Sequence, residues 1–285
     1  MRFIEIIYPL GASIIWSVNP AFIYKYARSA SPYYFTAIRA LLASIFIAIL
    51  VFTIGSPHLG DINTPILLLM ILSAILGPGL GDIAYTRAIQ LVGGSLAITI
   101  SYVYIFFAQL FAVLLFNERL SLMAIIGSIV AFTGIYIAIS ERNNTMLVTK
   151  RGIVCSISAA ILWGLAASMI SPIREYVDAY TTAFIRTLVV AIFALIMGFI
   201  HRDEFNIDKN TLIAASFTGI GGWGIGMVLF VYSIYTIGVS VTSTTTALAP
   251  VLSQFINKAI TGESISSRVF AGAILVCFGI IFTVL

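Results

Sequence analysis

Asp82 is the one carboxylate that lies well inside an apolar stretch of this sequence. An ionisable side chain in a hydrocarbon environment is costly, so it marks a functional site by default, such as a polar solute contact or a proton relay. Tyr85 follows three residues later and shares its helical face. The alternative is a structural ion pair with Arg87 or another basic residue. We expect Asp82 and Tyr85 to contribute to a binding site for a small solute, with Asp82 a candidate proton carrier.

A polar stripe runs along segment 93–116 and is repeated along segment 239–258. The first stripe has helical spacings of four, three, four and three: Ser95, Thr99, Tyr102, Phe106 and Gln109. The second has the same spacing: Ser240, Thr244, Ala247, Val251 and Gln254. Hydroxyl and amide groups in hydrocarbon need partners, so the stripes must face inward. They either line a cavity or bond helices together, at about 0.6–2 kcal/mol per bond. We expect cavity lining by Thr99, Tyr102, Gln109, Thr244 and Gln254.

Three tryptophans are further candidates for solute contact. Trp16 and Asn19 come just before Pro20, which frees a backbone carbonyl one turn back and can form a hinge. Trp163 has the matching place in a later segment, and Trp223 lies between two glycines. Tryptophans also anchor helices at the membrane interface. We expect Trp16, Asn19, Trp163 and Trp223 to contact the solute.

The elements that must position these residues are membrane helices. Of 285 residues, 60% are hydrophobic and 9% are charged, and the mean hydropathy is +1.09, whereas a soluble domain has roughly a quarter charged residues. Crossing the hydrocarbon takes about 20 apolar residues in a helix. Ten segments qualify: 3–24, 32–54, 65–90, 93–116, 121–140, 152–171, 180–200, 211–236, 239–258 and 267–285. The sequence predicts an all-α integral membrane protein with ten transmembrane helices.

The chain also repeats itself. A shift of 147 residues matches Ala12, Trp16, Arg39, Asp61, Asn63 and Thr64 to identical residues in the second half. After a two-residue slip, a shift of 145 matches Gly77, Gly79, Gly81, Gly93, Ser95, Thr99, Gln109, Glu118, Gly127 and Gly134. This pattern predicts two five-helix units, 1–145 and 146–285. Because five is odd, the second unit must insert in the opposite orientation, which is the inverted-repeat plan of many secondary transporters.

Charged residues suggest an orientation. The side without the termini carries eleven basic residues: Lys25, Arg28, Arg39, Arg87, Arg142, Lys150, Arg151, Arg202, Lys209, Lys258 and Arg268. The side with both termini carries four: Arg2, Arg119, Arg174 and Arg186. The positive-inside rule then places both termini outside the cytoplasm. Arg39 and Arg186 are close enough to a helix end to snorkel, so we expect them to be anchors, with attraction of an anion as the alternative.

Glycine spacing indicates close helix packing. Gly77-x3-Gly81 and Gly222-x3-Gly226 are small-residue motifs that let helices approach through their backbones. Their matched positions suggest that the third and eighth helices cross or slide on each other.

Other chemistry finds little support. The sequence has no His-Glu-x-x-His, Gly-x-Ser-x-Gly or Walker motif, and His58 and His201 lie in loops. Cys155 and Cys277 lie in apolar segments without metal-ligand spacing. No basic cluster is interleaved with aromatic residues as in nucleic-acid-binding proteins. We expect no catalytic residue, metal, cofactor or nucleic-acid partner.

The repeated tryptophan, the repeated arginine, the Glu118-Arg119-Leu120 turn and the following Gly127-x6-Gly134 resemble the EamA-type repeat of the ten-helix drug/metabolite transporter superfamily. The second half departs from this pattern at Gly262-Glu263-Ser264, which lacks the arginine. The resemblance implies that helices one, three, four, six, eight and nine surround a cavity.

It further implies a secondary carrier in the cell (plasma) membrane that exports a small metabolite, an amino acid or related amine foremost. An uncoupled facilitator or channel, or a non-transporting scaffold or receptor, are the alternatives. The sequence contains both repeats, so a monomer could form the whole pathway.

Overall fold

The computed structural model describes residues 3–55, 62–139, 149–261 and 267–284, and every regular element in these ranges is helical. The first half forms α1 (Ile7–Tyr26), α2 (Pro32–Thr53), α3 (Thr64–Ala74), α4 (Asp82–Val92), α5 (Gly94–Ser101), α6 (Tyr104–Phe116) and α7 (Leu122–Ile139). The second forms α8 (Lys150–Ser168), α9 (Ala179–Ile200), α10 (Lys209–Ser216), α11 (Gly226–Thr245), α12 (Leu248–Thr261) and α13 (Ser267–Val284). Short 3-10 turns, Phe3–Ile6 and Ser171–Glu175, lie before α1 and after α8.

Apolar length makes these helices membrane spans. Within the described ranges, seven helical stretches are long and apolar enough to cross a bilayer: Ile4–Tyr26, Pro32–Thr53, Thr64–Val92, Gly94–Phe116, Lys150–Glu175, Ala179–Ile200 and Lys209–Thr245. A shorter apolar helix, Leu122–Ile137, accompanies them. Large apolar side chains such as Phe52, Leu114 and Phe199 are exposed on the outside, as expected for contact with lipid. The chain is a multi-pass membrane protein.

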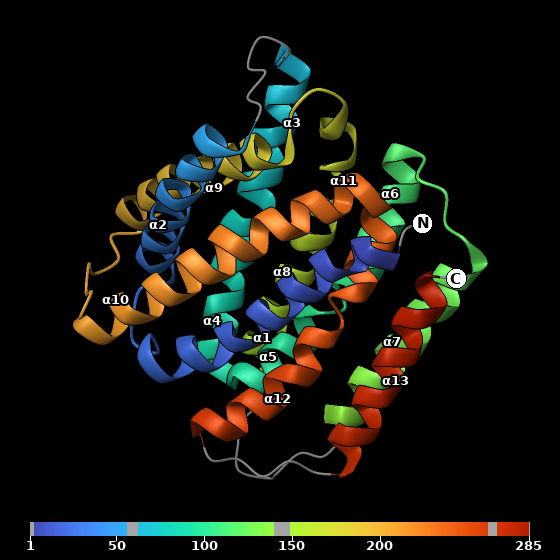
Figure 1. Ribbon diagram of the computed structural model, residues 1–285. Helices are drawn as coiled ribbons and strands as arrows, with labels where there is room; N and C mark the ends of the chain where they lie inside the picture. Colours follow the sequence, from blue (N-terminus) through green and yellow to red (C-terminus); the bar gives the residue numbers. More distant parts are fainter. Residues whose placement is uncertain (1–2, 56–61, 140–148, 262–266, 285) are drawn as a thin grey trace.

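The helices form a central group flanked by two pairs. α2 packs along α9, and α7 packs along α13. Figure 1 shows the two pairs at opposite edges of the molecule, with α1, α4, α5, α8 and α11 between them. The termini lie close together at the same end as the tops of α6 and α11.

Two helices change pitch at the same point of the repeat. A π-helical stretch, Ile75–Gly81, joins α3 to α4, and a second one, Phe217–Ile225, joins α10 to α11. The first contains Gly77, Gly79 and Gly81, and the second contains the matched Gly222 and Gly224, with the matched Gly226 directly after it. π-Helical turns are rare and frequently occur at functional sites. Asp82 directly follows the first stretch, and Trp223 lies within the second.

The matched glycines make reciprocal contacts between the halves. A Cβ added to Gly81 would lie 2.7 Å from Cδ1 of Trp163, and one added to Gly226 would lie 2.6 Å from Nε1 of Trp16. Gly79 faces Phe193 in the same way that Gly224 faces the matched Phe46.

The glycine run of the first half therefore packs against α8 and α9, and the run of the second half packs against α1 and α2. This differs from the expected crossing of the third and eighth helices, because the opposite half supplies the bulky rings that fill the glycine surfaces.

The α7–α13 pair repeats this reciprocity. A Cβ on Gly134 would lie 2.6 Å from the carbonyl oxygen of Gly272, and one on Gly279 would lie 2.5 Å from that of Gly127. Gly127 matches Gly272, and Gly134 matches Gly279, so the same contact occurs twice with the halves exchanged.

A break at Gly238 separates the eighth and ninth predicted segments. Its φ of 80° is non-helical, and Gly93 has the corresponding φ of 84° before α5. The Glu118 carboxylate accepts a hydrogen bond from the Ser240 backbone N–H at 3.3 Å, just after this break. The matched Glu263 lies outside the described residues, as do Asp61 and most of the 141–151 connector.

Candidate solute-binding cavity

A cavity of about 100 Å³ lies between the two halves. Seven of the residues predicted from sequence line it: Trp16, Asn19, Asp82, Tyr85, Tyr102, Trp163 and Trp223. The structure adds ten that the sequence reasoning did not assign to a site: Arg39, Gly77, Pro78, Ile98, Tyr104, Ala166, Ala167, Arg186, Met227 and Phe230. This volume is well above the roughly 10–15 Å³ that a single water needs, so the space can hold several waters or a small organic molecule.

Asp82 is held by three other helical elements. Its Oδ1 accepts a hydrogen bond from Nε1 of Trp163 at 2.8 Å, and its Oδ2 accepts one from Nε1 of Trp223 at 3.1 Å. Nη1 of Arg39 lies 3.5 Å from Oδ2, which makes an ion pair. Asp82 is 7% exposed. This is the ion pair of the alternative interpretation, with Arg39 on α2 as the basic residue in place of Arg87.

Both arginines of the repeat line the cavity. Arg39 is 1% exposed and Arg186 is 2% exposed, so the expectation that they snorkel to a helix end as anchors is wrong. The guanidinium of Arg39 lies 4.6 Å from the ring centroid of Trp223 and 5.3 Å from that of Phe35. Arg186 donates from Nη1 to the Ser73 hydroxyl at 3.2 Å. These rings and hydroxyls hold two guanidinium groups inside the protein.

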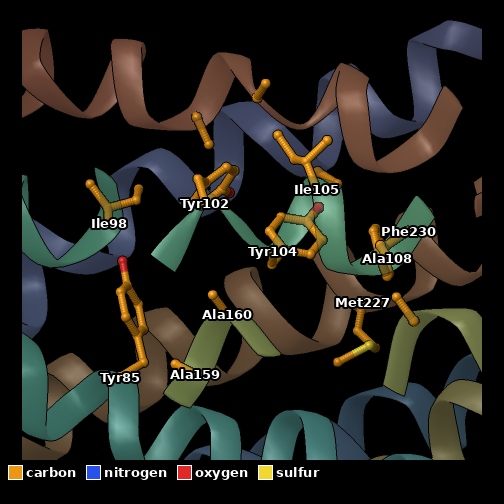
Figure 2. Packing of buried hydrophobic residues seen from close by; sticks show 14 of the residues in the cluster. Tyr85, Ile98, Tyr102, Tyr104, Ile105, Ala108, Ala159, Ala160, Met227 and Phe230 are labelled. Atoms are coloured by element: carbon orange, nitrogen blue, oxygen red, sulfur yellow. The ribbon is translucent and has the colours of Figure 1, made fainter. Parts of the chain in front are cut away.

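Aromatic rings form most of the remaining wall. Nε1 of Trp16 donates to the Gly222 carbonyl at 2.7 Å, and its ring lies 5.1 Å from that of Phe230. The Tyr85 ring meets the Trp163 ring edge to face at 4.8 Å. Figure 2 shows Tyr85 pointing from α4 toward Ile98, with Met227 and Phe230 on the α11 side. An apolar wall with few polar groups is typical of a small-molecule site.

The sequence predicts a possible hinge in α1 at Pro20, and the structure does not show a helix break there. α1 continues through Pro20 to Tyr26, so no break occurs there. Asn19 packs against Gly222, and its Oδ1 is buried without a hydrogen-bond partner among the described residues. Asn19 is therefore an unsatisfied acceptor at the cavity wall, which a donor group on a ligand could fill.

Four residues of the polar stripes lie away from the cavity lining. Nε2 of Gln109 donates to Ser128 at 2.5 Å and to Thr244 at 3.1 Å, and Ser128 and Thr244 bond to each other at 2.9 Å. This network joins α6, α7 and α11. Thr99 donates to the Ser95 carbonyl of its own helix at 2.6 Å, and Gln254 donates to the Pro250 carbonyl at 3.4 Å. The Gln109 and Thr244 contacts match the alternative, in which the stripes bond helices together. The Thr99 and Gln254 bonds stay within one helix and match neither interpretation.

Each half has a helix interruption after the break at Gly93 or Gly238. α5 gives way to α6 at Tyr102 and Val103, and α11 gives way to α12 at Thr246 and Ala247, one residue earlier in the repeat. The Tyr104 and Thr246 hydroxyls bond to each other, which joins the two interruptions. Ser13 donates to the Thr246 carbonyl at 3.2 Å and thus satisfies a backbone group near the break.

The donor set does not suggest a metal centre: among the described residues, no three His, Cys, Asp or Glu side chains form a cluster that could hold an ion. The cavity can instead offer two guanidinium groups, one engaged carboxylate, tyrosine hydroxyls and aromatic faces to a small solute.

Comparisons with known proteins agree with this architecture. A solved structure, described only as the crystal structure of a protein, superposes with a TM-score of 0.80 at 17% identity, over 99% of this chain and 96% of that chain, and shows the fold alone. A relative from Archaeoglobus fulgidus, named an uncharacterized transporter, is 24% identical over 286 residues, which cover 99% of this chain and 98% of the relative. The sequence model of the EamA-like transporter family matches residues 3–140 and again 150–285. This chain therefore belongs to the EamA-like transporter family and is a membrane transporter.

Proposed function

We propose that this chain is a secondary carrier that moves a small metabolite, foremost an amino acid or related amine, out of the cell by alternating access. The observation that carries the proposal is the position of the cavity. Its wall is drawn from both halves, and Asp82 of the first half is bonded to Trp163 and Trp223 of the second. A rocking motion of one half against the other would open and close this space.

Reciprocal contacts support an inverted repeat with units 1–145 and 146–285. When residue i of one unit meets residue j of the other and the matched pair meets again with the units exchanged, the units are related by a two-fold axis. The Gly81–Trp163 and Gly226–Trp16 contacts have this relation. With five helices per unit, such an axis would lie in the membrane plane and would give two states of similar energy, open to opposite sides.

We place the carrier in the cell (plasma) membrane, and the charge asymmetry supports an orientation with both termini outside the cytoplasm. Labelling can test it. With Cys155 and Cys277 replaced by serine, a cysteine introduced at Asn206 should react with a membrane-impermeant maleimide only after the cells are opened. Reaction in intact cells would show that the chain has the opposite orientation, with both termini in the cytoplasm.

Counterflow in proteoliposomes tests the carrier function. Liposomes loaded with one unlabelled amino acid or amine are diluted into a trace of the same labelled compound, and a panel of both classes is screened. A carrier transiently accumulates label above equilibrium, whereas a channel or facilitator only equilibrates it. Equilibration without overshoot would favour the facilitator, and no flux of any compound through folded, inserted protein would favour a scaffold.

Proton coupling can be tested in the same vesicles. If Asp82 carries a proton, an imposed pH gradient should drive uphill accumulation of the solute that counterflow identifies. Accumulation that ignores the gradient would leave Asp82 as a structural and binding group.

A further inference from the structure

Arg186 is a buried cation that has no counter-ion among the residues that the structure describes. It is 2% exposed and lines the cavity, and its Nε has no hydrogen-bond partner among the described residues. Its hydrogen bond from Nη1 goes to a neutral hydroxyl, that of Ser73. In the described part of the chain, the ion pair at the cavity is between Arg39 and Asp82. Buried charges in proteins are normally paired, so an unpaired guanidinium at a cavity wall implies an absent anion.

The repeat itself shows what is missing. Arg39 and Arg186 are matched positions, and Arg39 pairs with the Asp82 carboxylate at 3.5 Å. The position that matches Asp82 in the second half is Met227, which also lines the cavity. The first arginine therefore has a carboxylate from its own half, and the second has a thioether in its place. An external carboxylate would complete the second half.

Charge and size define the ligand further. Among the cavity-lining side chains, Arg39 and Asp82 neutralise each other and Arg186 leaves one positive charge. Asp82 already accepts two indole N–H bonds and faces Arg39, which leaves it poorly placed to take up the ammonium of an amine. The walls are mainly aromatic and aliphatic, and the cavity of about 100 Å³ is small.

We propose that Arg186 is the anion subsite of the cavity and binds the carboxylate of a small organic monocarboxylate whose apolar body lies against Trp16, Met227 and Phe230. This rests on the proposed carrier function and narrows its substrate class. Amino acids and other monocarboxylates belong to it, and amines without a carboxylate do not. The planar guanidinium presents donors in a geometry that matches a carboxylate in a bidentate manner.

Tryptophan fluorescence offers a direct test. The chain has three tryptophans, and all three line the cavity: Trp16, Trp163 and Trp223. Purified protein is titrated with four compounds that share one carbon skeleton: leucine, 4-methylpentanoate, its neutral amide 4-methylpentanamide, and 4-methylpentylamine. We expect the two carboxylates to change the fluorescence saturably and the amide and the amine to leave it unchanged at the same concentrations.

Three variants locate the subsite. Arg186→Gln should weaken carboxylate binding by about ten- to hundredfold, the range expected for loss of a charged hydrogen bond. Arg186→Lys keeps the charge without the planar fork, so it should bind more weakly than wild type and more tightly than Arg186→Gln. Arg119→Gln removes an exposed arginine outside the cavity and should bind as wild type. Thermal unfolding of each variant checks that it is folded.

The outcomes are decisive. Equal binding of amide and carboxylate, unchanged binding in Arg186→Gln, or no saturable carboxylate response in folded wild-type protein would each overturn the anion subsite. If carboxylates bind through Arg186 but none undergoes counterflow, the anion subsite stands and the carrier function fails. If counterflow occurs but selects amines, the carrier stands and the anion subsite fails.

Discussion

Trp163 donates its indole N–H to Asp82 across the boundary between the two halves, at 2.8 Å. Trp223 reaches the other carboxylate oxygen at 3.1 Å, so one side chain of the first half holds two tryptophans of the second. Arg39 adds an ion pair from α2. Any movement of one half against the other must therefore stretch or exchange bonds at Asp82, which makes this residue a structural support as well as part of the cavity wall.

Replacement of Asp82 by asparagine should destabilise the protein. Asp82→Asn leaves Arg39 buried with no counter-charge, and the loss of one partner of a buried pair typically costs about 3–5 kcal/mol. We expect the free energy of unfolding in detergent, measured by denaturant titration, to fall by an amount in this range.

A double-mutant cycle separates the ion pair from the tryptophan bonds. Arg39→Gln combined with Asp82→Asn removes both charges together. The double variant should be less destabilised than the sum of the two single variants by about 1–3 kcal/mol, which is a typical coupling energy for residues in contact. Simple additivity would show that Arg39 and Asp82 do not interact, contrary to the 3.5 Å pair.

Replacing each of the two matched arginines by glutamine should change the stability of the protein in opposite directions. Arg39→Gln leaves Asp82 without its cation and should lower stability. Arg186→Gln removes a buried charge that has no counter-ion among the described residues, so it should raise the stability of the ligand-free protein by about 1 kcal/mol, as often happens where a functional residue is strained. Thermal unfolding of the two variants side by side measures this. Equal destabilisation by both would contradict the view that Arg186 awaits a ligand.

Most of the architecture could be predicted from the sequence because its signals are long. Single residues do not obscure an apolar run of twenty residues or a repeat with matched tryptophans. These patterns predict the helices and the tryptophans that line the cavity. Asp82 stood out for a different reason: a carboxylate in an apolar run has few explanations.

The inward position of Arg39 and Arg186 cannot be predicted from the sequence, for a physical reason. A position seven residues inside a helix is compatible with snorkelling, and only the packing of α2 along α9 shows that the side chains turn inward instead. Sequence spacing gives the face of a helix but not the neighbour that covers it. The same limit applies to Tyr104, whose role depends on the helix interruption after Tyr102.

The polar stripe illustrates a second limit. An inward face can meet either a cavity or another helix, and Gln109 and Thr244 meet Ser128 and each other. Thr244→Val should therefore lower the free energy of unfolding by only about 0.6 kcal/mol, the average for bonds between membrane helices. Carboxylate binding should stay as in wild type. Tyr102→Leu, at the cavity wall, is the comparison variant, and its binding should change. If carboxylate binding were weakened in Thr244→Val but not in Tyr102→Leu, the polar stripe would be part of the binding site after all.

The N-terminal end of α10, which Asp208 caps, should become less stable at acidic pH. Hydrogen bonds from the side chain and the backbone N–H of Thr211 lower the pKa of Asp208 below its usual value of 3.8. The pKa of Asp208 is lower in the folded protein than in the unfolded chain. The stability that this helix cap contributes is therefore fully present above the unfolded pKa and is lost as the pH falls through the folded pKa. Hydrogen exchange over 209–216, corrected for intrinsic rates, should rise in wild type below about pH 4.

Asp208→Asn keeps a cap acceptor without a titrating group. Its exchange over 209–216 should show a smaller rise on acidification, and an equal rise in both proteins would mean that another group controls this helix end.

Gly81, in the first matched run, and Gly221, next to the second run, provide the sharpest test of the interface between the halves. A Cβ at Gly81 would lie 2.7 Å from Cδ1 and 2.9 Å from Nε1 of Trp163, the nitrogen that binds Asp82. Gly81→Ala should therefore displace this indole and cost about 1–3 kcal/mol through overpacking. At Gly221 the new Cβ would meet only Cγ2 of Ile15, at an ordinary 3.9 Å. Gly221→Ala should leave stability unchanged or raise it by up to about 1 kcal/mol, because alanine favours helix. Unfolding curves and the tryptophan emission maximum measure both effects. If the two alanines behaved alike, the close approach of Gly81 to Trp163 would not be what holds the halves together, and the bonds at Asp82 would have to do so alone.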